Sequence, residues 1–292
     1  MYEKLDKCPG CSSSSIGNHF ICTDHVVSGE SFALSACQDC ELVFTNPRPV
    51  KDLMGNYYKS ENYVPHTKRK GVFNQIYRAA RSLNIRNKLK LLPGDSFAGK
   101  LLDVGCGTGE FLAACKKSGW DVTGVEPHFQ ANSASAEILG ISIHTDISQV
   151  TGDNTFEVIT FWHALEHIYE LHETIDHAKR LLTKSGRILI ALPNRDSLDA
   201  GIYGPSWAGY DVPRHLYHFN QNSFSRLARE HGLKLTDKIP LRFDAYFVSL
   251  LSEKYKTGSR NWVRSFITGY KSNSYANSNQ KNFSSIIYIL KK

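Results

Sequence analysis

The stretch Lys100-Leu-Leu-Asp-Val-Gly-Cys-Gly-Thr-Gly-Glu-Phe111 decides the fold of this chain. A short apolar run ends at Asp103, three glycines follow at every second position, and a helix-like segment begins at Glu110. We therefore predict a buried strand, a tight turn and the N-terminus of a helix. Because glycine has no Cβ, a ligand can approach the main chain of such a turn closely.

A second apolar run ends in Gly124-Val-Glu126. In nucleotide-binding α/β proteins, an acidic side chain about 20 residues beyond the glycine turn holds the ribose of the ligand. Glu126 is therefore the candidate ribose ligand, and the remaining question is which nucleoside the turn accepts.

The composition excludes fibrous, disordered and membrane-spanning classes. The chain has 292 residues, 41% hydrophobic and 22% charged, with a formal net charge of +7. A mild positive charge permits an anionic substrate, although basic runs such as Arg78 to Lys90 also fit a solvated helical face. The N-terminal residues lack the apolar region of a signal peptide, and no apolar run reaches the ~20 residues of a membrane span. We expect a cytoplasmic protein, in which seven cysteines indicate metal or free thiols rather than disulfides.

Three regions follow from the pattern along the chain. Residues 1–48 are rich in Cys, Ser and Gly, residues 49–95 read as a linker and a helical segment that includes Phe73–Ala80, and residues 96–292 form the main domain. In the main domain, apolar runs alternate with helical spacing, which predicts βαβ units on a parallel sheet. The expected strands are 101–104, 122–125, 156–162, 187–192, 233–239 and 284–290, and the expected helices are near 110–118, 128–139, 171–183 and 223–231. Residues 253–282 carry little pattern.

Two C-x-x-C pairs lie in the N-terminal region, Cys8-Pro-Gly-Cys11 and Cys37-Gln-Asp-Cys40. Four thiolates on two tight turns suit tetrahedral zinc, and a closed four-ligand site is structural rather than catalytic. We predict a zinc ribbon with these four ligands, which would stabilise a fragment too small to hold its own core. The other cysteines have no partner pattern and are expected to be small core residues: Cys22, Cys106 and Cys115.

The glycine spacing separates two classes of nucleoside. A dinucleotide fingerprint requires G-x-G-x-x-G, whereas here the third glycine comes one residue early, at 109. Glu110 would also repel a pyrophosphate, so the helix N-terminus better suits a ligand that carries a carboxylate and no phosphates. The G-x-G-x-G turn after Asp103, with Glu126 as ribose ligand, resembles the class I S-adenosylmethionine-dependent methyltransferases.

That resemblance covers residues 95 to 245 and the last strand, and it implies an α/β, Rossmann-like, seven-stranded sheet. It also implies S-adenosylmethionine or S-adenosylhomocysteine as cofactor, with Asp146 meeting the adenine amino group. The cofactor-binding residues carried over from it are Asp103, Gly105, Cys106, Gly107, Thr108, Gly109, Glu126, Pro127, Asp146, Ile147, Trp162 and His163.

The whole layout resembles a narrower group. A four-cysteine zinc module before such a domain, together with Asp211-Val-Pro-Arg-His-Leu-Tyr-His-Phe219, resembles sugar methyltransferases of surface-polysaccharide and antibiotic-sugar pathways. The sugar C-methyltransferases of that group are longer than this chain. We therefore expect O-methylation of a sugar or a related small-molecule hydroxyl.

Methyl transfer from a sulfonium requires in-line positioning and removal of the acceptor proton. His215 is our candidate general base, because the pKa of histidine lies near neutrality. Arg214 is expected to meet a substrate anion, and His163 is a third catalytic candidate. The alternative is that Arg214, His215 and His218 bond carbonyl groups to hold the loop. Substrate contacts are expected from Glu166, His167, Tyr210, Asp211, Arg214 and His218.

Four other functions remain open at this stage. His163-Ala-Leu-Glu-His167 spells the H-x-x-E-H motif of one zinc-peptidase class, which would need a helix carrying both histidines. A nicotinamide-dependent oxidoreductase is disfavoured by the early third glycine. A nucleic-acid-binding protein would use the ribbon as reader and basic residues 68–90 as phosphate contact. An RNA methyltransferase is a variant of the methyl-transfer prediction. The oligomeric state does not follow from the sequence.

Overall fold

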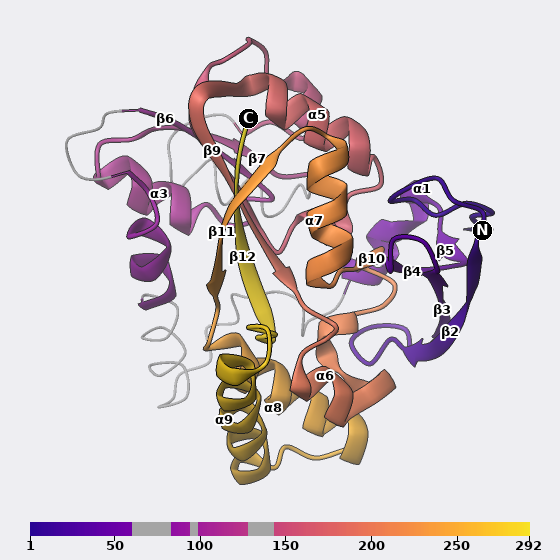
Figure 1. Cartoon of the computed structure of the whole chain (residues 1–292). Helices are drawn as coiled ribbons and strands as arrows, with labels where there is room; N and C mark the ends of the chain where they lie inside the picture. The colour runs from indigo at the N-terminus through magenta and orange to yellow at the C-terminus, as the bar shows by residue number, and fades with distance from the viewer. Residues whose placement is uncertain (60–82, 94–98, 128–142) are drawn as a thin grey trace. The chain divides into compact units, whose positions relative to one another are not determined.

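The computed structural model describes residues 1–59, 83–93, 99–127 and 143–292 (Figure 1). Its contacts divide the chain into two compact units. Unit 1 comprises Met1–Tyr63, His163–Glu173 and Ile190–Leu290, and unit 2 comprises Val64–Trp162, Thr174–Leu189 and Lys291–Lys292. These boundaries differ from the three regions expected from the sequence, and the division into those regions remains a prediction.

Unit 2 contains the parallel strands that the apolar runs predict. Their bounds are β6 (Lys100–Val104), β7 (Asp121–Val125), β8 (Phe156–Trp162) and the first part of β9 (Leu182–Pro193), in the order β9-β8-β6-β7. Strand β6 pairs in parallel with both β7 and β8. Four of the five residues of β6 are buried, as expected for a strand covered on both faces. The α/β class with a mostly parallel sheet is confirmed.

The glycine turn has the backbone that its sequence requires. The φ angles of Gly105, Gly107 and Gly109 are 77°, 54° and 74°, a region that side chains with a Cβ rarely occupy. The turn leads into α3 (Glu110–Lys117), whose first turn carries an acidic residue and whose last turn carries two lysines. Both charges are favourable for the helix dipole. The predicted strand, turn and helix are therefore present.

Two helices of the sequence prediction, 73–80 and 128–139, lie outside the described residues, as do the basic residues 68–70. Helix α5 (Leu171–Leu181) is present as expected, and residues 83–89 are also helical. At the edge of β7, Val125 forms an isolated parallel bridge with His144. The described residues contribute six strands to the main sheet, with β7 at one edge. The bridge between Val125 and His144 lies at that edge.

Unit 1 begins with the N-terminal ribbon. Strands β2 (Ile16–Thr23), β3 (Ser31–Cys37) and β4 (Val43–Thr45) form an antiparallel sheet. Its fourth strand is β10 (Tyr217–His218), which pairs with β4 although it lies about 170 residues later in the chain (Figure 1). The short strands β1 (Tyr2–Glu3) and β5 (Arg48–Pro49) pair with each other, and α1 (Lys51–Met54) and the 3-10 turn η1 (Gly55–Tyr58) follow.

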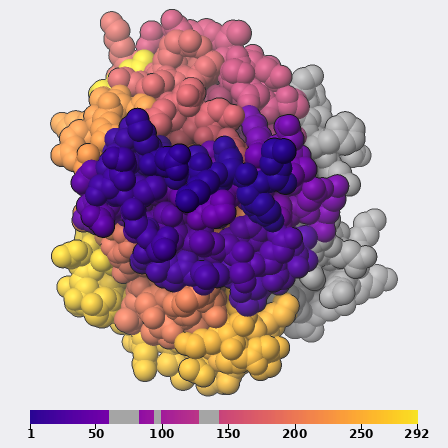
Figure 2. Space-filling model, turned by 90° about the vertical axis from the view of Figure 1, so that its right-hand side faces the viewer, coloured from indigo at the N-terminus to yellow at the C-terminus, as the bar shows by residue number. Residues whose placement is uncertain are grey.

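The ribbon shares its core with residues from the second half of the chain. Cys22, Phe32, Leu34 and Val43 pack with a cluster around α6 (Leu198–Tyr203) and the turns that follow it. Figure 2 shows the same association from outside, with N-terminal residues in indigo bordering C-terminal residues in orange. Cys22, Cys106 and Cys115 are all buried, as predicted for small core residues. The ribbon is therefore part of unit 1 rather than an appended tail.

The C-terminal part of unit 1 contains α7 (Gln221–Glu230), β11 (Lys234–Pro240), α8 (Asp244–Thr257), α9 (Trp262–Ser278) and β12 (Ser285–Lys291). Strands β11 and β12 lie in the order β11-β12-β9 with the end of β9. Helix α7 and both strands match the sequence prediction. Among the described residues, no helix is long and apolar enough to cross a membrane.

The prediction that residues 253–282 carry little pattern is wrong, because they contain the end of α8 and all of α9. The residues that α9 buries are small or polar: Ser265, Thr268, Gly269, Ser272, Asn273 and Ala276. Its large apolar side chains, including Trp262, Phe266 and Tyr270, are exposed. A Cβ on Gly269 would lie 2.8 Å from the ring of Tyr246, so α8 and α9 pack closely. The usual apolar periodicity is inverted, and a reading of hydrophobic spacing misses the helix.

Candidate functional site

The glycine turn and Glu126 form one hydrogen-bonded structure in unit 2. The amide of Gly107 donates to Oε2 of Glu126 at 2.9 Å, and the amides of Gly105 and Cys106 donate to the carbonyl oxygen of Val125 at 2.8 and 3.1 Å. Glu126 is only 6% exposed. The carboxylate that the sequence assigns to a ribose is therefore fixed beside the turn, at the carboxyl end of β7.

Asp103 ends the apolar part of β6 and is buried next to β8. Burial raises the pKa of Asp103 to about 7, partly offset by a hydrogen bond from the hydroxyl of Thr160 at 2.6 Å. The nearby ammonium of Lys88 also favours the carboxylate. That ammonium lies 4.3 Å from the ring centroid of Trp162, which meets the ring of Phe111 edge to face at 5.3 Å. The end of β8 thus carries an aromatic wall.

Asp146 lies one short turn beyond the bridge to β7. Its side chain accepts a hydrogen bond from the amide of Ser148 at 2.9 Å and caps the 3-10 turn η2 (Ile147–Gln149). The amide of Glu126 donates to the carbonyl oxygen of His144 at 2.8 Å, which ties this segment to the end of β7. Asp146 is exposed and Ile147 is buried. The assignment of Asp146 to adenine remains a prediction.

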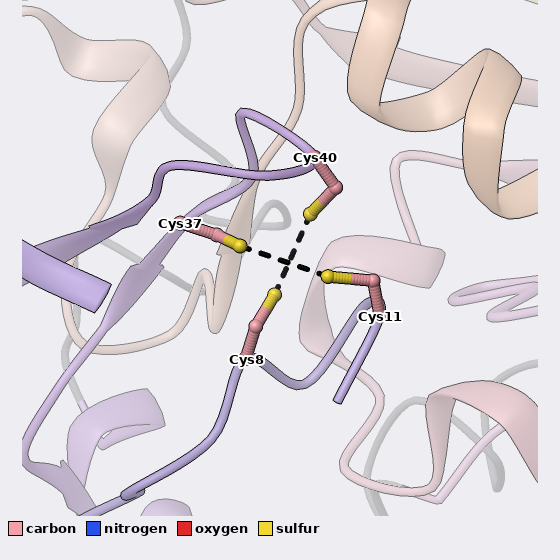
Figure 3. Close-up of side chains that lie close together, drawn as sticks. All are labelled: Cys8, Cys11, Cys37 and Cys40. Carbon is pink, nitrogen blue, oxygen red and sulfur yellow. Dashed lines mark hydrogen bonds between the residues drawn. The ribbon is translucent and has the colours of Figure 1, made fainter. Parts of the chain in front are cut away.

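The four predicted zinc ligands converge on one point (Figure 3). The sulfurs of Cys8 and Cys40 lie 3.5 Å apart, and those of Cys11 and Cys37 lie 3.6 Å apart. Zinc–sulfur bonds of about 2.3 Å in a tetrahedron would place sulfurs about 3.8 Å apart. The quartet therefore fits a zinc ion. The amide of Gly10 also donates to the sulfur of Cys8 at 3.3 Å, a contact that stabilises a thiolate.

His163, in unit 1, directly follows β8 in the chain and lies between two carboxylates. Its Nε2 is 3.1 Å from Asp244, and its Nδ1 is 3.4 Å from Oε1 of Glu166. Burial would lower the pKa of His163, but Asp244 and Glu166 outweigh it and raise the pKa to about 9. The two carboxylates thus favour the protonated ring of His163, which bridges them. The catalytic role of His163 stays a prediction.

The motifs 163–167 and 211–219 meet in unit 1. Glu166 and His167 lie on the 3-10 turn η3 (Leu165–His167), and the amide of Leu216 donates to the carbonyl oxygen of Glu166 at 2.8 Å. The ring centroids of His167 and His215 are 4.6 Å apart. Burial, helped by repulsion from His215, lowers the pKa of His167 to about 4, which keeps this ring neutral.

One ring nitrogen of His215 is held by a main-chain hydrogen bond. Its Nδ1 is 2.9 Å from the carbonyl oxygen of Gly209, in the 3-10 turn η5 (Ala208–Tyr210), and a carbonyl can only accept. Nδ1 therefore carries the proton and donates, which leaves the lone pair on Nε2. His215 is 8% exposed. This geometry suits a proton acceptor or a metal ligand.

Arg214 contradicts the sequence prediction. Its side chain is fully buried, and its Nη2 contacts Asp24 at 2.9 Å and Asp211 at 2.6 Å. Nε also donates to Asp211, and Nη1 donates to the carbonyl oxygen of Tyr57. A guanidinium whose donors are engaged inside the protein does not meet a substrate anion. Arg214 instead braces the loop, which is the alternative considered from the sequence.

Three further predicted substrate contacts are also used by the fold. Asp211 pairs with Arg214, the ring of Tyr210 packs in the core cluster with Trp207, and Nε2 of His218 lies 3.2 Å from the hydroxyl of Thr45. The peptidase prediction fails as well, because η3 spans only three residues and His163 lies outside it. The sequence prediction missed three partners: Asp24, Asp244 and Tyr58, whose hydroxyl lies 3.0 Å from Nδ1 of His167. No local motif marks residues that arrive from distant elements.

Comparison with known proteins identifies the family. Residues 76–238, more than half of the chain, match the family model described as "Methyltransferase domain", and the chain belongs to this family. A ubiquinone biosynthesis O-methyltransferase from Pseudomonas aeruginosa is 26% identical over 160 residues, which cover 50% of this chain and 68% of that protein. The corresponding enzyme from Pseudomonas putida is 27% identical over 180 residues, which cover 56% of this chain and 75% of that protein.

Solved structures support the fold. Geranyl diphosphate C-methyltransferase from Streptomyces coelicolor superposes with a TM-score of 0.54 at 16% identity, over 78% of this chain and 85% of that chain. A chain from a complex between the Haloferax volcanii Trm112 methyltransferase activator and a methyltransferase superposes with a TM-score of 0.52 at 12% identity. The match covers 70% of this chain and 86% of that chain. At these identities the likeness establishes the fold alone.

We predict that Arg214→Ala lowers the free energy of unfolding by about 3–5 kcal/mol, because it leaves the buried Asp24 and the partly buried Asp211 without their cation. Urea unfolding measures the loss. Lys51→Ala is the control, since Lys51 pairs with Glu170 at the surface and should change stability little. An Arg214→Ala protein with normal stability but a raised KM for the acceptor would restore the substrate role.

We predict that the purified chain contains one zinc ion in the cysteine quartet, and that Cys8→Ser or Cys40→Ser loses it. The thermal midpoint should fall by at least about 5 °C, since each kcal/mol corresponds to about 2–4 °C in a domain of this size. Elemental analysis and calorimetry measure both effects. Cys22→Ser, which changes a buried cysteine outside the quartet, should keep the zinc; zinc retained by both quartet variants would contradict the assignment.

Proposed function

We propose that this member of the methyltransferase-domain family transfers a methyl group from S-adenosylmethionine to a hydroxyl of a sugar or a related small molecule. The observation that carries the donor half is the glycine turn whose Gly107 amide is bonded to Glu126. Family membership supports methyl transfer in general. The acceptor half rests on the zinc quartet and the 211–219 motif.

The described residues can hold the donor through its nucleoside end. Glu126 would accept hydrogen bonds from the ribose hydroxyls, and Asp146 would accept from the adenine amino group. The open main chain at Gly105 and Gly107 allows close approach, and the N-terminus of α3 favours the donor's own carboxylate. When bound, S-adenosylmethionine supplies an electrophilic methyl group. Trp162 and Phe111 provide an apolar wall that would exclude water from it.

His215 is the residue to which we assign activation of the acceptor hydroxyl. The carbonyl oxygen of Gly209 fixes its tautomer, so Nε2 keeps the lone pair that a proton acceptor requires. Of the other two catalytic candidates, His163 lies between two carboxylates that raise its pKa, and Arg214 is buried in ion pairs. Glu166 and His167 each place a possible ligand atom within 4.8 Å of one on His215.

Oxygen is the acceptor atom that the relatives favour. The curated relatives quoted above carry O-methyltransferase in their names, and their likeness is at the level of sequence. The C-methyltransferase likeness is structural only. The sugar itself is supported by the resemblance of the zinc module and the 211–219 motif to sugar methyltransferases. A small-molecule acceptor also fits the basic segment 68–90, which lacks the interleaved aromatic residues of a nucleic-acid-binding surface beyond Phe73 and Tyr77.

We predict that the chain binds S-adenosylhomocysteine one to one in isothermal titration calorimetry. Gly107→Arg should weaken binding at least tenfold, because a side chain is strained at φ 54° and would enter the turn. Glu126→Ala should weaken it by a similar factor by removing the ribose acceptor. Gly55→Arg is the matched control, since Gly55 has an ordinary φ and open space around it. Failure of the unaltered chain to bind would overturn the proposed function.

We predict that His215→Ala lowers kcat by about 10²- to 10⁴-fold, the range of a lost acid–base group, while the Kd for S-adenosylhomocysteine stays within twofold. A panel of hydroxylated acceptors that includes nucleotide-linked sugars provides the assay. His177→Ala, whose ring bonds the carbonyl oxygen of Val150, should keep wild-type turnover. If His215→Ala instead abolishes cofactor binding, the residue is structural.

A further inference from the structure

Glu166 is a buried carboxylate whose hydrogen-bonding capacity the protein leaves unused. The residue has 0% exposure, and neither Oε1 nor Oε2 has a hydrogen-bond partner among the described residues. Nδ1 of His163 lies 3.4 Å from Oε1, an ion-pair contact that helps to hold the pKa of Glu166 below its usual value against the effect of burial. Buried carboxylates ordinarily accept several hydrogen bonds or coordinate a metal.

Two histidines lie beside this carboxylate. Ligand atoms of Glu166, His167 and His215 all lie within 4.8 Å of one another. Nδ1 of His167 is 3.0 Å from the carbonyl oxygen of Arg214, and Nδ1 of His215 is 2.9 Å from that of Gly209. A carbonyl oxygen can only accept, so in each neutral ring Nδ1 carries the proton and the lone pair is on Nε2. The hydroxyl of Tyr58, also 3.0 Å from Nδ1 of His167, then accepts from the same N–H. A carbonyl that fixes the tautomer in this way is the usual outer contact of a metal-binding histidine.

We propose that Glu166, His167 and His215 bind one divalent transition-metal ion. Two imidazoles and one carboxylate suit Mn²⁺, Fe²⁺, Co²⁺ or Zn²⁺ better than Mg²⁺ or Ca²⁺, which prefer oxygen ligands. The site is separate from the cysteine quartet, which uses thiolates alone. Three protein ligands leave at least one coordination position for a water molecule or an acceptor oxygen.

The ion would refine the proposed function. Its chemical role rests on that function, whereas its binding does not. When bound, the ion would supply Lewis-acid chemistry, because it would lower the pKa of an acceptor hydroxyl that it contacts. Nε2 of His215 would then contribute to activation of that hydroxyl as a metal ligand, in place of the direct proton acceptance proposed above for the metal-free site. His163, between Glu166 and Asp244, would fix the carboxylate from the outer side.

The test titrates Mn²⁺ into the full-length chain with zinc already in the cysteine quartet, and follows the electron paramagnetic resonance signal of free Mn²⁺. Manganese is chosen because thiolates hold zinc in preference to it. We expect one Mn²⁺ per chain. Glu166→Gln and His215→Gln should each weaken binding at least tenfold, and His177→Gln, a histidine outside the cluster, should bind as the unaltered chain does.

A thermal melt with and without Mn²⁺ keeps the test decisive if a variant is unstable, because a bound ion raises the midpoint of the folded protein. The unaltered chain should gain stability with Mn²⁺, and Glu166→Gln should not. The proposed site is wrong if the unaltered chain binds no Mn²⁺ up to millimolar concentration. It is also wrong if Glu166→Gln and His215→Gln both bind Mn²⁺ as tightly as the unaltered chain does. S-adenosylhomocysteine binding by the same preparations is read separately, so loss of the metal site leaves the proposed methyl transfer standing.

Discussion

The buried guanidinium of Arg214 is the interaction on which the arrangement of unit 1 depends. It joins Asp24, from the N-terminal ribbon, to Asp211, from the loop after α6, and it reaches the main chain of Tyr57. An uncompensated charge at this depth is costly, so the three elements are held together or the structure opens. The same residue positions the histidines, because its carbonyl oxygen accepts from His167 and its neighbour is His215.

This brace explains why a ribbon that could be an appendage is part of a larger core. Strand β10 completes the ribbon sheet, and the hydroxyl of Thr45 in β4 donates to the carbonyl oxygen of His215 at 2.8 Å. The cysteine quartet gathers one end of the ribbon, and the paired strands hold the other. Through these contacts the N-terminal 50 residues support the loop that carries His215.

Sequence reasoning failed where a residue's partners come from distant elements. Arg214 was expected at the substrate because an arginine beside a histidine in a loop is a reasonable anion ligand, and nothing near it in sequence announces Asp24. His163 was considered as a base, but Asp244, about 80 residues later, favours its protonated ring. Helix α9 was missed because it buries serine, threonine and glycine and exposes its aromatic side chains.

The sequence by itself determined the parallel strands, the glycine turn, the cysteine quartet and the family of the main domain. These features depend on local rules: apolar runs form buried strands, left-handed turns need glycine, and paired C-x-x-C turns gather sulfurs. Only the tertiary structure decided which polar residues are available for chemistry. The sequence shows that an arginine, a histidine or a glutamate is present, but not what surrounds it. Burial and partners distinguish Arg214, held in ion pairs, and His163, held between two carboxylates, from His215 and Glu166. His215 is fixed through Nδ1 alone by a carbonyl oxygen, and the oxygens of Glu166 have no hydrogen-bond partner among the described residues.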